Sequence, residues 1–164
     1  MARQVGVRPQ ILEAVDEVNS RQKTILLSRI EKHFENALTG RTVAVWGLSF
    51  KPRTDDIREA PALALIDRLL ELGAAVRVHD PEAIANVRAQ YGGKLTYCDQ
   101  PYDAAEGADA LVIMTEWKEF GHPDFGRLKK LMKAPVIFDG RNLYNPATLK
   151  VAGFRYHSIG RASV

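Results

Sequence analysis

The sequence predicts an α/β protein built on one parallel sheet with helices on both faces. Short β-branched segments alternate with amphipathic segments along most of the 164 residues, and such alternation is typical of β–α–β units. Parallel strands need crossover connections, and these are right-handed. The pattern therefore favours a doubly wound, Rossmann-like sheet of six strands in the order 3-2-1-4-5-6. A long N-terminal helix is expected before the first strand.

This first helix covers residues from about 9 to 35. Apolar side chains recur along it every three to four residues, at Ile11, Val15, Val18, Ile25 and Ile30. The helix precedes the first strand, so it is not an ordinary crossover helix. Its apolar stripe either packs back on its own sheet or packs elsewhere, on a neighbouring domain or on a second copy of the chain. We expect the second arrangement.

The other elements follow in alternation. Strands are expected at residues 42–47, 75–79, 95–97, 109–114, 135–138 and 154–157. Helices are expected at residues 61–72, 82–91, 101–106, 123–132 and 146–151. The strand at 109–114 has the strongest signal of a buried strand, and the strand at 95–97 has the weakest.

Composition is that of an ordinary globular domain, with 46% hydrophobic and 26% charged residues. The net charge is only +3, and no basic run alternates with aromatic residues, which argues against nucleic-acid binding. The single cysteine, Cys98, excludes an internal disulfide, and the four scattered histidines show no metal-ligand spacing. Without a signal peptide or an apolar stretch long enough to span a membrane, we expect a cytoplasmic protein.

A charged loop, residues 50–61, connects the first strand to the next helix. It carries three cations and three carboxylates at the carboxyl end of a strand, where open α/β sheets bind ligands. Two interpretations remain open. In one, the loop binds a ligand. In the other, it is structural: Asp56 and Glu59 form a capping box, Pro61 opens the helix, and the cations pair with the carboxylates.

A dinucleotide site at this loop is not expected. Its fingerprint, Gly-x-Gly-x-x-Gly, lets a backbone without side chains approach a pyrophosphate. Residues 47–52 contain only one glycine, Gly47. Asp80 ends the second strand, where a ribose-binding acid would lie, but before Pro81 it suits a turn equally well.

Side chains on the same rim of the sheet suit a nucleotide diphosphate. Lys51 supplies a flexible charge, and Arg58 and Arg141 supply planar guanidinium groups that match phosphate oxygens. Arg141 follows the fifth strand, so it lies on the same carboxyl-end rim as Lys51. Phe50 supplies a flat ring against which a base can lie.

Residues 47–61 closely resemble the signature that opens the C-terminal domain of the UDP-glucose/GDP-mannose dehydrogenase family. The similarity continues through residues 78–81, 115–120, 138–144 and 153–161 and extends to Val18 and Asn19 in the long helix. On this resemblance, residues 1–38 are the central helix, which links domains and serves dimerisation. Residues 39–164 are the Rossmann-like domain that binds the UDP-sugar.

The resemblance implies an oxidoreductase that uses NAD to oxidise the C6 alcohol of a nucleotide sugar to a carboxylate in two steps. UDP-glucose, giving UDP-glucuronate, is the expected substrate; GDP-mannose and UDP-N-acetylhexosamines are the alternatives. NAD would be bound mainly by an N-terminal domain whose fingerprint and catalytic-cysteine segment are missing from this sequence. Cys98 lies outside any such segment, so no catalytic residue is assigned, and this chain alone is expected to be inactive.

By position, the resemblance assigns Phe50, Lys51 and Arg141 to the UDP-sugar, with Lys51 near the ribose or the diphosphate. It assigns Arg58 to NAD across the domain cleft. The expected partners are UDP-glucose or UDP, the protein's own N-terminal domain, and a second copy through the long helix. No nucleic acid, membrane or metal is expected. A dimerisation or scaffold module remains the alternative function.

The resemblance also implies that the pair Asp55 and Asp56 orders the charged loop. A phosphoacceptor receiver-like domain is not expected, since receivers hold their acids at strand ends and this pair lies within the loop.

Overall fold

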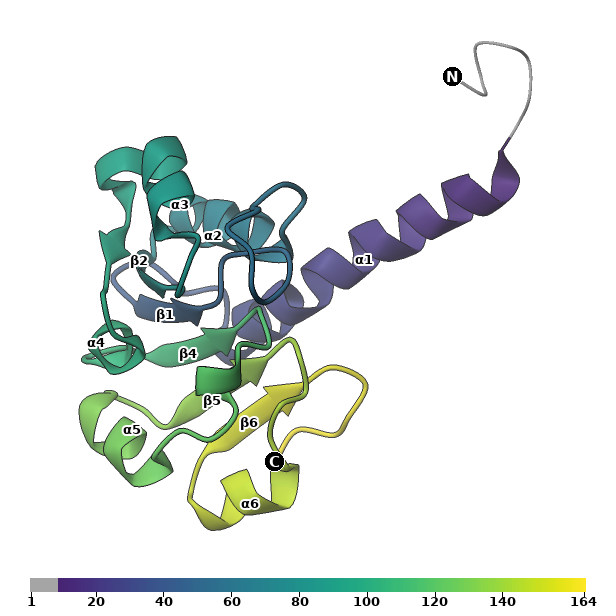
Figure 1. Ribbon diagram of the computed structural model, residues 1–164. Helices are drawn as coiled ribbons and strands as arrows, with labels where there is room; N and C mark the ends of the chain where they lie inside the picture. Colours follow the sequence, from purple (N-terminus) through teal and green to yellow (C-terminus); the bar gives the residue numbers. More distant parts are fainter. Residues whose placement is uncertain (1–8) are drawn as a thin grey trace.

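The computed structural model describes residues 9–164, and six parallel strands form one sheet in the order β3-β2-β1-β4-β5-β6 (Figure 1). The predicted fold class and strand order are confirmed. The first eight residues of the segment 1–38 lie outside the described residues.

The strands are β1 (Thr42–Trp46), β2 (Ala75–His79), β3 (Thr96–Tyr97), β4 (Ala110–Ile113), β5 (Val136–Asp139) and β6 (Arg155–Ser158). The α-helices are α1 (Gln10–His33), α2 (Pro61–Glu71), α3 (Ile84–Tyr91), α4 (Pro101–Ala105), α5 (Phe125–Leu131) and α6 (Pro146–Val151). Two short 3₁₀ helices, η2 (Gly92–Lys94) and η3 (Lys118–Phe120), complete the described elements.

Strand β1 shows why the sheet has a hydrophobic core on each face. Successive residues of a strand point to opposite faces. Val43 and Val45 pack in the core shared with α1, α2 and α3, whereas Ala44 and Trp46 pack in the core shared with α4, α5 and α6. All four are at most 1% exposed. Burial on both faces explains why the sequence of this strand is continuously apolar instead of alternating.

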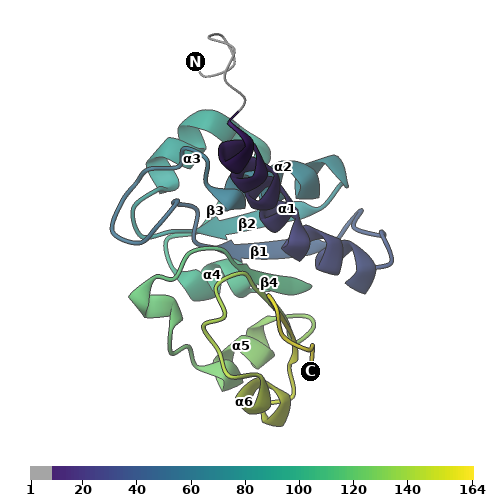
Figure 2. The same ribbon diagram turned by 90° about the vertical axis from the view of Figure 1, so that its right-hand side faces the viewer.

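Helix α1 is divided between two environments. In its second half, Leu26 and Ile30 are buried in the core beside α2 and β5. In its first half, Ile11 and Leu12 are 80% and 64% exposed, and that half projects beyond the sheet (Figures 1 and 2). The expectation that the stripe would pack away from its own sheet is therefore wrong for the second half. The helix is longer than the sheet face that it covers, so only part of the stripe finds a partner there.

Two histidines, His33 and His157, pack where α1 contacts the sheet. His157 of β6 stacks on Phe138 of β5, with ring centroids 4.7 Å apart, and the His33 ring of α1 meets both rings edge-on. Burial lowers the pKa of His157 to about 4, with smaller contributions from the positive charges of His33, Arg29 and Arg155. Burial also lowers the pKa of His33. Burial at this contact thus disfavours the protonated form of both imidazoles.

Across residues 9–164, no helix is both long and apolar enough to cross a bilayer. Among the side chains that the structure describes, no three of the His, Cys, Asp or Glu type come together as potential metal ligands.

Candidate functional site

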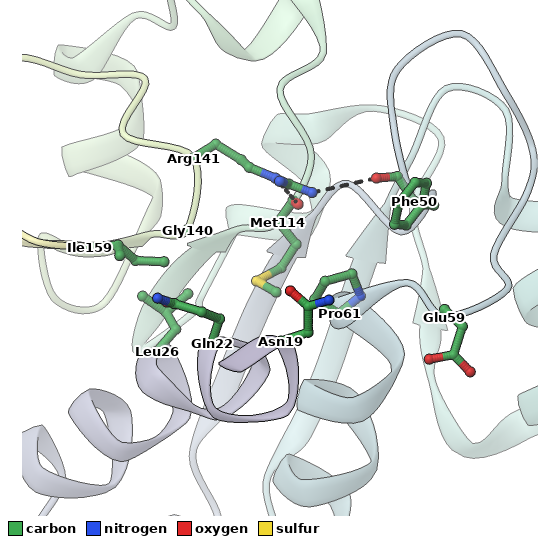
Figure 3. Close-up of a pocket in the computed structure, with 10 residues that line it drawn as sticks. All are labelled: Asn19, Gln22, Leu26, Phe50, Glu59, Pro61, Met114, Gly140, Arg141 and Ile159. Atoms are coloured by element: carbon green, nitrogen blue, oxygen red, sulfur yellow. Dashed lines mark hydrogen bonds between the residues drawn. The ribbon is translucent and has the colours of Figure 1, made fainter. Parts of the chain in front are cut away.

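A cavity of about 690 Å³ opens at the carboxyl ends of the central strands (Figure 3). Phe50 reaches it from the loop after β1, Met114 from the end of β4, Arg141 from the turn after β5, and Ile159 from the segment after β6. The strand order reverses between β1 and β4, and ligands of doubly wound sheets bind at such a switch point. The cavity is therefore at the position where the fold provides a ligand site.

Helix α1 forms one wall of this cavity. Asn19, Gln22 and Leu26 line it, and their spacing of three and four residues places them on one face of the helix. Figure 3 shows the two amides beside the methionine side chain of the β4 end. Asn19 and Gln22 were not predicted as site residues. The sequence carries the spacing, but it does not say that this face of α1 turns toward the strand ends.

Phe50 and Arg141 meet across the mouth of the cavity, as their positions after parallel strands predicted. Arg141 Nη2 donates a hydrogen bond to the Phe50 carbonyl oxygen at 3.4 Å, and Arg141 Nε donates to the Met114 carbonyl oxygen at 2.7 Å. The Phe50 side chain is half-exposed at the rim. One guanidinium thus ties together the loops that follow three neighbouring strands.

The turn that carries Arg141 is fixed by the buried carboxylate of Asp139. Its oxygens accept hydrogen bonds from the backbone N–H of Arg141 at 2.8 Å and of Leu143 at 2.7 Å, and from the Tyr156 hydroxyl at 2.8 Å. Burial, and then the hydrogen bond to Asp139, raise the pKa of Tyr156, so this hydroxyl remains a donor at physiological pH. The position of the Arg141 backbone is therefore set from inside the core.

Arg58 lies apart from the cavity, held by its own loop. Its Nε and Nη2 donate to the two carboxylate oxygens of Asp56 at 2.9 and 2.7 Å, and its side chain is 88% exposed. Hydrogen bonds from the Arg58 side chain and backbone hold the pKa of Asp56 at about 2. Asp55 accepts a hydrogen bond from Asn86 at 3.1 Å. Both carboxylates thus form contacts of the kind expected for residues that order the loop.

The capping-box interpretation of Asp56 and Glu59 is wrong. Glu59 has a left-handed backbone, with φ of 56°, which a residue in the first turn of a helix does not adopt. Helix α2 begins later, with Pro61 in its first turn, and its N-cap residue Ala60 makes no side-chain cap. The role expected for Pro61 as the opening residue of the helix is confirmed.

Lys51 is exposed and is not among the residues that line the cavity. Its positive charge makes a small contribution to the lowered pKa of Asp56. The structure therefore brings Phe50 and Arg141 together, but it places Lys51 and Arg58 beside the site and not in its wall.

The turn after β1 is closed to a dinucleotide. Backbone N–H groups of Leu48 and Ser49 donate to one carboxylate oxygen of Asp80 at 2.7 and 3.1 Å, and Trp117 Nε1 donates to the same oxygen at 3.1 Å. Thr115 packs directly against Gly47. Asp80 is only 2% exposed, so it acts as an internal support of this turn and does not reach a ribose. These residues do not fit the pyrophosphate of NAD at this position.

These features define the class of the molecule: a doubly wound α/β domain whose switch-point cavity is lined by side chains and not by a glycine-rich turn. Comparison with known proteins identifies the family. The model of the UDP-glucose/GDP-mannose dehydrogenase family, UDP binding domain, matches residues 44–146. The chain belongs to this family.

A UDP-glucose 6-dehydrogenase of Pseudomonas aeruginosa is 51% identical over 98% of this chain and 36% of its own length. The UDP-glucose 6-dehydrogenase TuaD of Bacillus subtilis is 40% identical over 100% of this chain and 35% of its own length. The solved UDP-glucose dehydrogenase of Pyrobaculum islandicum superposes with a TM-score of 0.83 at 31% identity, over 98% of this chain and 34% of that one. The chain thus spans about a third of the length of these relatives and matches their C-terminal part.

Proposed function

We propose that the switch-point cavity binds the UDP part of a UDP-sugar, and that the chain serves as the nucleotide-binding domain of a cytoplasmic UDP-glucose 6-dehydrogenase. In this role the whole enzyme oxidises UDP-glucose to UDP-glucuronate with NAD. The observation that carries the proposal is the meeting of Phe50 and Arg141 at the mouth of a cavity of about 690 Å³. Membership of the family whose matched domain is named for UDP binding supports the choice of nucleotide.

Each side chain has a distinct task in this proposal. The half-exposed ring of Phe50 stacks on the flat base, and the guanidinium of Arg141 binds the diphosphate. Lys51 follows Phe50 directly, and its flexible ammonium swings over the rim toward the ribose or the phosphates. Asn19 and Gln22 offer both donors and acceptors, which suit ribose hydroxyls.

NAD has no complete site within the described residues, because the turn after β1 is filled by Asp80 and Thr115. The proposed contribution of this chain to the cofactor is one contact, from Arg58. Its guanidinium stands on the exposed side of the loop, already oriented by Asp56. The remaining contacts to NAD would come from another part of the enzyme, and residues 39–164 would close over the nucleotide sugar from their own side.

The first half of α1 supports the proposal of a second partner, another copy of the chain. Ile11, Leu12, Val15 and Val18 are all between 45% and 80% exposed along it. Residues 1–38 would then serve as a linking and dimerisation helix beside the UDP-binding domain of residues 39–164.

Calorimetric titration with UDP, with GDP and NAD as comparison ligands, tests the nucleotide site. Arg141→Ala should weaken UDP binding roughly 10- to 150-fold, which corresponds to about 1.5–3 kcal/mol for a lost charge-assisted contact. Arg155→Ala is the matched control, because Arg155 begins β6 at the opposite, amino end of the sheet. An unchanged affinity in Arg141→Ala would remove this residue from the site. Failure of UDP to bind more tightly than GDP or NAD would refute the proposed nucleotide.

A further inference from the structure

The guanidinium of Arg141 is engaged on one side only. Its Nε donates to the Met114 carbonyl oxygen at 2.7 Å, and its Nη2 lies 3.4 Å from the Phe50 carbonyl oxygen. A carboxylate oxygen of Glu116 stands 3.1 Å from the same Nε. Among the side chains that the structure describes, none forms a hydrogen bond or ion pair with Nη1. The N–H groups on that side are therefore available to a phosphate.

Glu116 is itself held in place by its two neighbours. Thr115 is fully buried, and its hydroxyl donates to the Ser49 carbonyl oxygen at 2.6 Å. The indole N–H of Trp117 donates to the buried carboxylate of Asp80 at 3.1 Å. Because the residues on both sides of Glu116 are held in this way, the backbone at Glu116 is fixed beside Arg141, and its carboxylate lies 3.1 Å from Arg141 Nε.

We propose that Glu116 is a positioning residue of the phosphate site: together with the Met114 carbonyl oxygen it holds the guanidinium of Arg141 at the cavity mouth before the ligand arrives and leaves the Nη1 side for phosphate oxygens. The inference rests on the proposed function, since it concerns the same nucleotide site. A free arginine side chain loses much of its rotamer freedom when it binds a ligand, and that loss lowers affinity. An arginine that is already ordered avoids most of it.

Glu116 could instead compete with the phosphate for Arg141, and the contact geometry argues against this. The carboxylate approaches Nε, whereas the phosphate would use the N–H groups of the other side, so the two do not share a donor. Repulsion between the carboxylate and the phosphate is reduced by water, because the Glu116 side chain is 45% exposed. Ordering of Arg141 therefore outweighs repulsion of the ligand.

Measurements of folding stability and of UDP affinity distinguish a structural role of Glu116 from a positioning role. The ion pair has side-chain exposures of 30% for Arg141 and 45% for Glu116, and such exposed pairs contribute little to folding stability. Glu116→Gln should therefore leave the midpoint of urea unfolding unchanged, while it weakens binding of UDP. Uridine, which lacks phosphate, should bind Glu116→Gln and the unchanged chain equally.

Glu119→Gln is the matched control. Glu119 lies three residues further on, its side chain is 44% exposed, and it pairs with His79 at 2.9 Å instead of with Arg141. Calorimetric titration should show UDP bound about three- to tenfold more weakly by Glu116→Gln and with unchanged affinity by Glu119→Gln. In an Arg141→Ala background, Glu116→Gln should have no further effect. Unchanged or tighter UDP binding by Glu116→Gln would overturn the proposal.

A second measurement keeps this test distinct from the test of UDP binding itself. The Nε–H resonance of Arg141, assigned by its absence in Arg141→Ala, reports in NMR whether the guanidinium is fixed. Glu116→Gln should shift and broaden it, and Glu119→Gln should not. If the unchanged chain failed to bind UDP, the proposed function would fall, and this resonance would still decide the role of Glu116. An unaltered resonance in Glu116→Gln would overturn the positioning role.

Discussion

Replacement of Gly47 by alanine is the most direct test of how the loop after β1 is built. Gly47 follows β1 immediately and has a backbone φ of 89°. A Cβ atom added there would lie 2.6 Å from both the Cβ and the backbone nitrogen of Thr115, well inside van der Waals contact. Gly40 is a matched control, because its φ is 76° and a Cβ atom added to it meets nothing within 4 Å.

The comparison of the two variants separates the cost of backbone strain from the cost of overpacking. Both substitutions force an alanine into a left-handed conformation, which costs about 1–2 kcal/mol. Only Gly47→Ala also overpacks a buried site, which costs about 1–3 kcal/mol more. Thr115 cannot easily yield, because it is fully buried and its hydroxyl is bonded to the Ser49 carbonyl oxygen at 2.6 Å. We expect a loss of about 2–5 kcal/mol for Gly47→Ala and about 1–2 kcal/mol for Gly40→Ala.

Urea unfolding followed by circular dichroism gives both values on the same scale. The fluorescence of Trp46 and Trp117 gives a second probe of the same transition, since both lie close to the substituted turn. If Gly47→Ala proved no more destabilising than Gly40→Ala, the close packing of Thr115 against this turn could not be what holds the loop.

Two further predictions concern the contact between α1 and the sheet and the exposed half of α1. The pKa of His157 is lowered to about 4 in the folded chain, so the unfolded chain binds more protons between pH 4 and 6.5. Stability should thus be fully present above pH 6.5 and fall by about 1–3 kcal/mol toward pH 4. Urea titrations across this range should show the loss, and His157→Phe should reduce it. Sedimentation should show concentration-dependent association. Replacing both Ile11 and Val15 by serine should abolish it, whereas Val151→Ser, at an exposed apolar residue of α6, should leave it intact.

Much of the fold could be predicted because periodicity and connection rules act locally. The apolar run of β1 and the helical spacing of α2 identify the elements, and right-handed crossovers then restrict the strand order. The packing of α1 could not be predicted in this way. An amphipathic stripe shows which side of a helix is buried, but not what covers it. Leu26 and Ile11 both belong to the apolar stripe of α1, yet Leu26 is 2% exposed and Ile11 is 80% exposed.

The same limit applies to the candidate site: some of its contacts could be predicted from the strand order, and those that depend on long-range packing could not. Phe50 and Arg141 could be predicted to approach each other, because both follow parallel strands and the carboxyl ends of such strands share one edge. Asn19 and Gln22 enter the cavity only through the angle at which α1 crosses the sheet, which depends on long-range packing. Glu116 also gave no signal of its own, since its contact with Arg141 joins the ends of two strands that are distant in the sequence.

In this sheet, the carboxylate of Asp80 takes the place that the pyrophosphate of a dinucleotide would have. The backbone N–H groups of Leu48 and Ser49 lie in the turn where a dinucleotide-binding domain faces its pyrophosphate, and here they donate to the Asp80 carboxylate instead. An internal anion thus satisfies these donors. Changing Phe50 to glycine would not create a site for NAD, because the donors would remain occupied and Thr115 would still close the turn at Gly47. These two N–H groups are therefore not available to a phosphate, and the proposed function assigns that task to the side chain of Arg141, which lines the cavity.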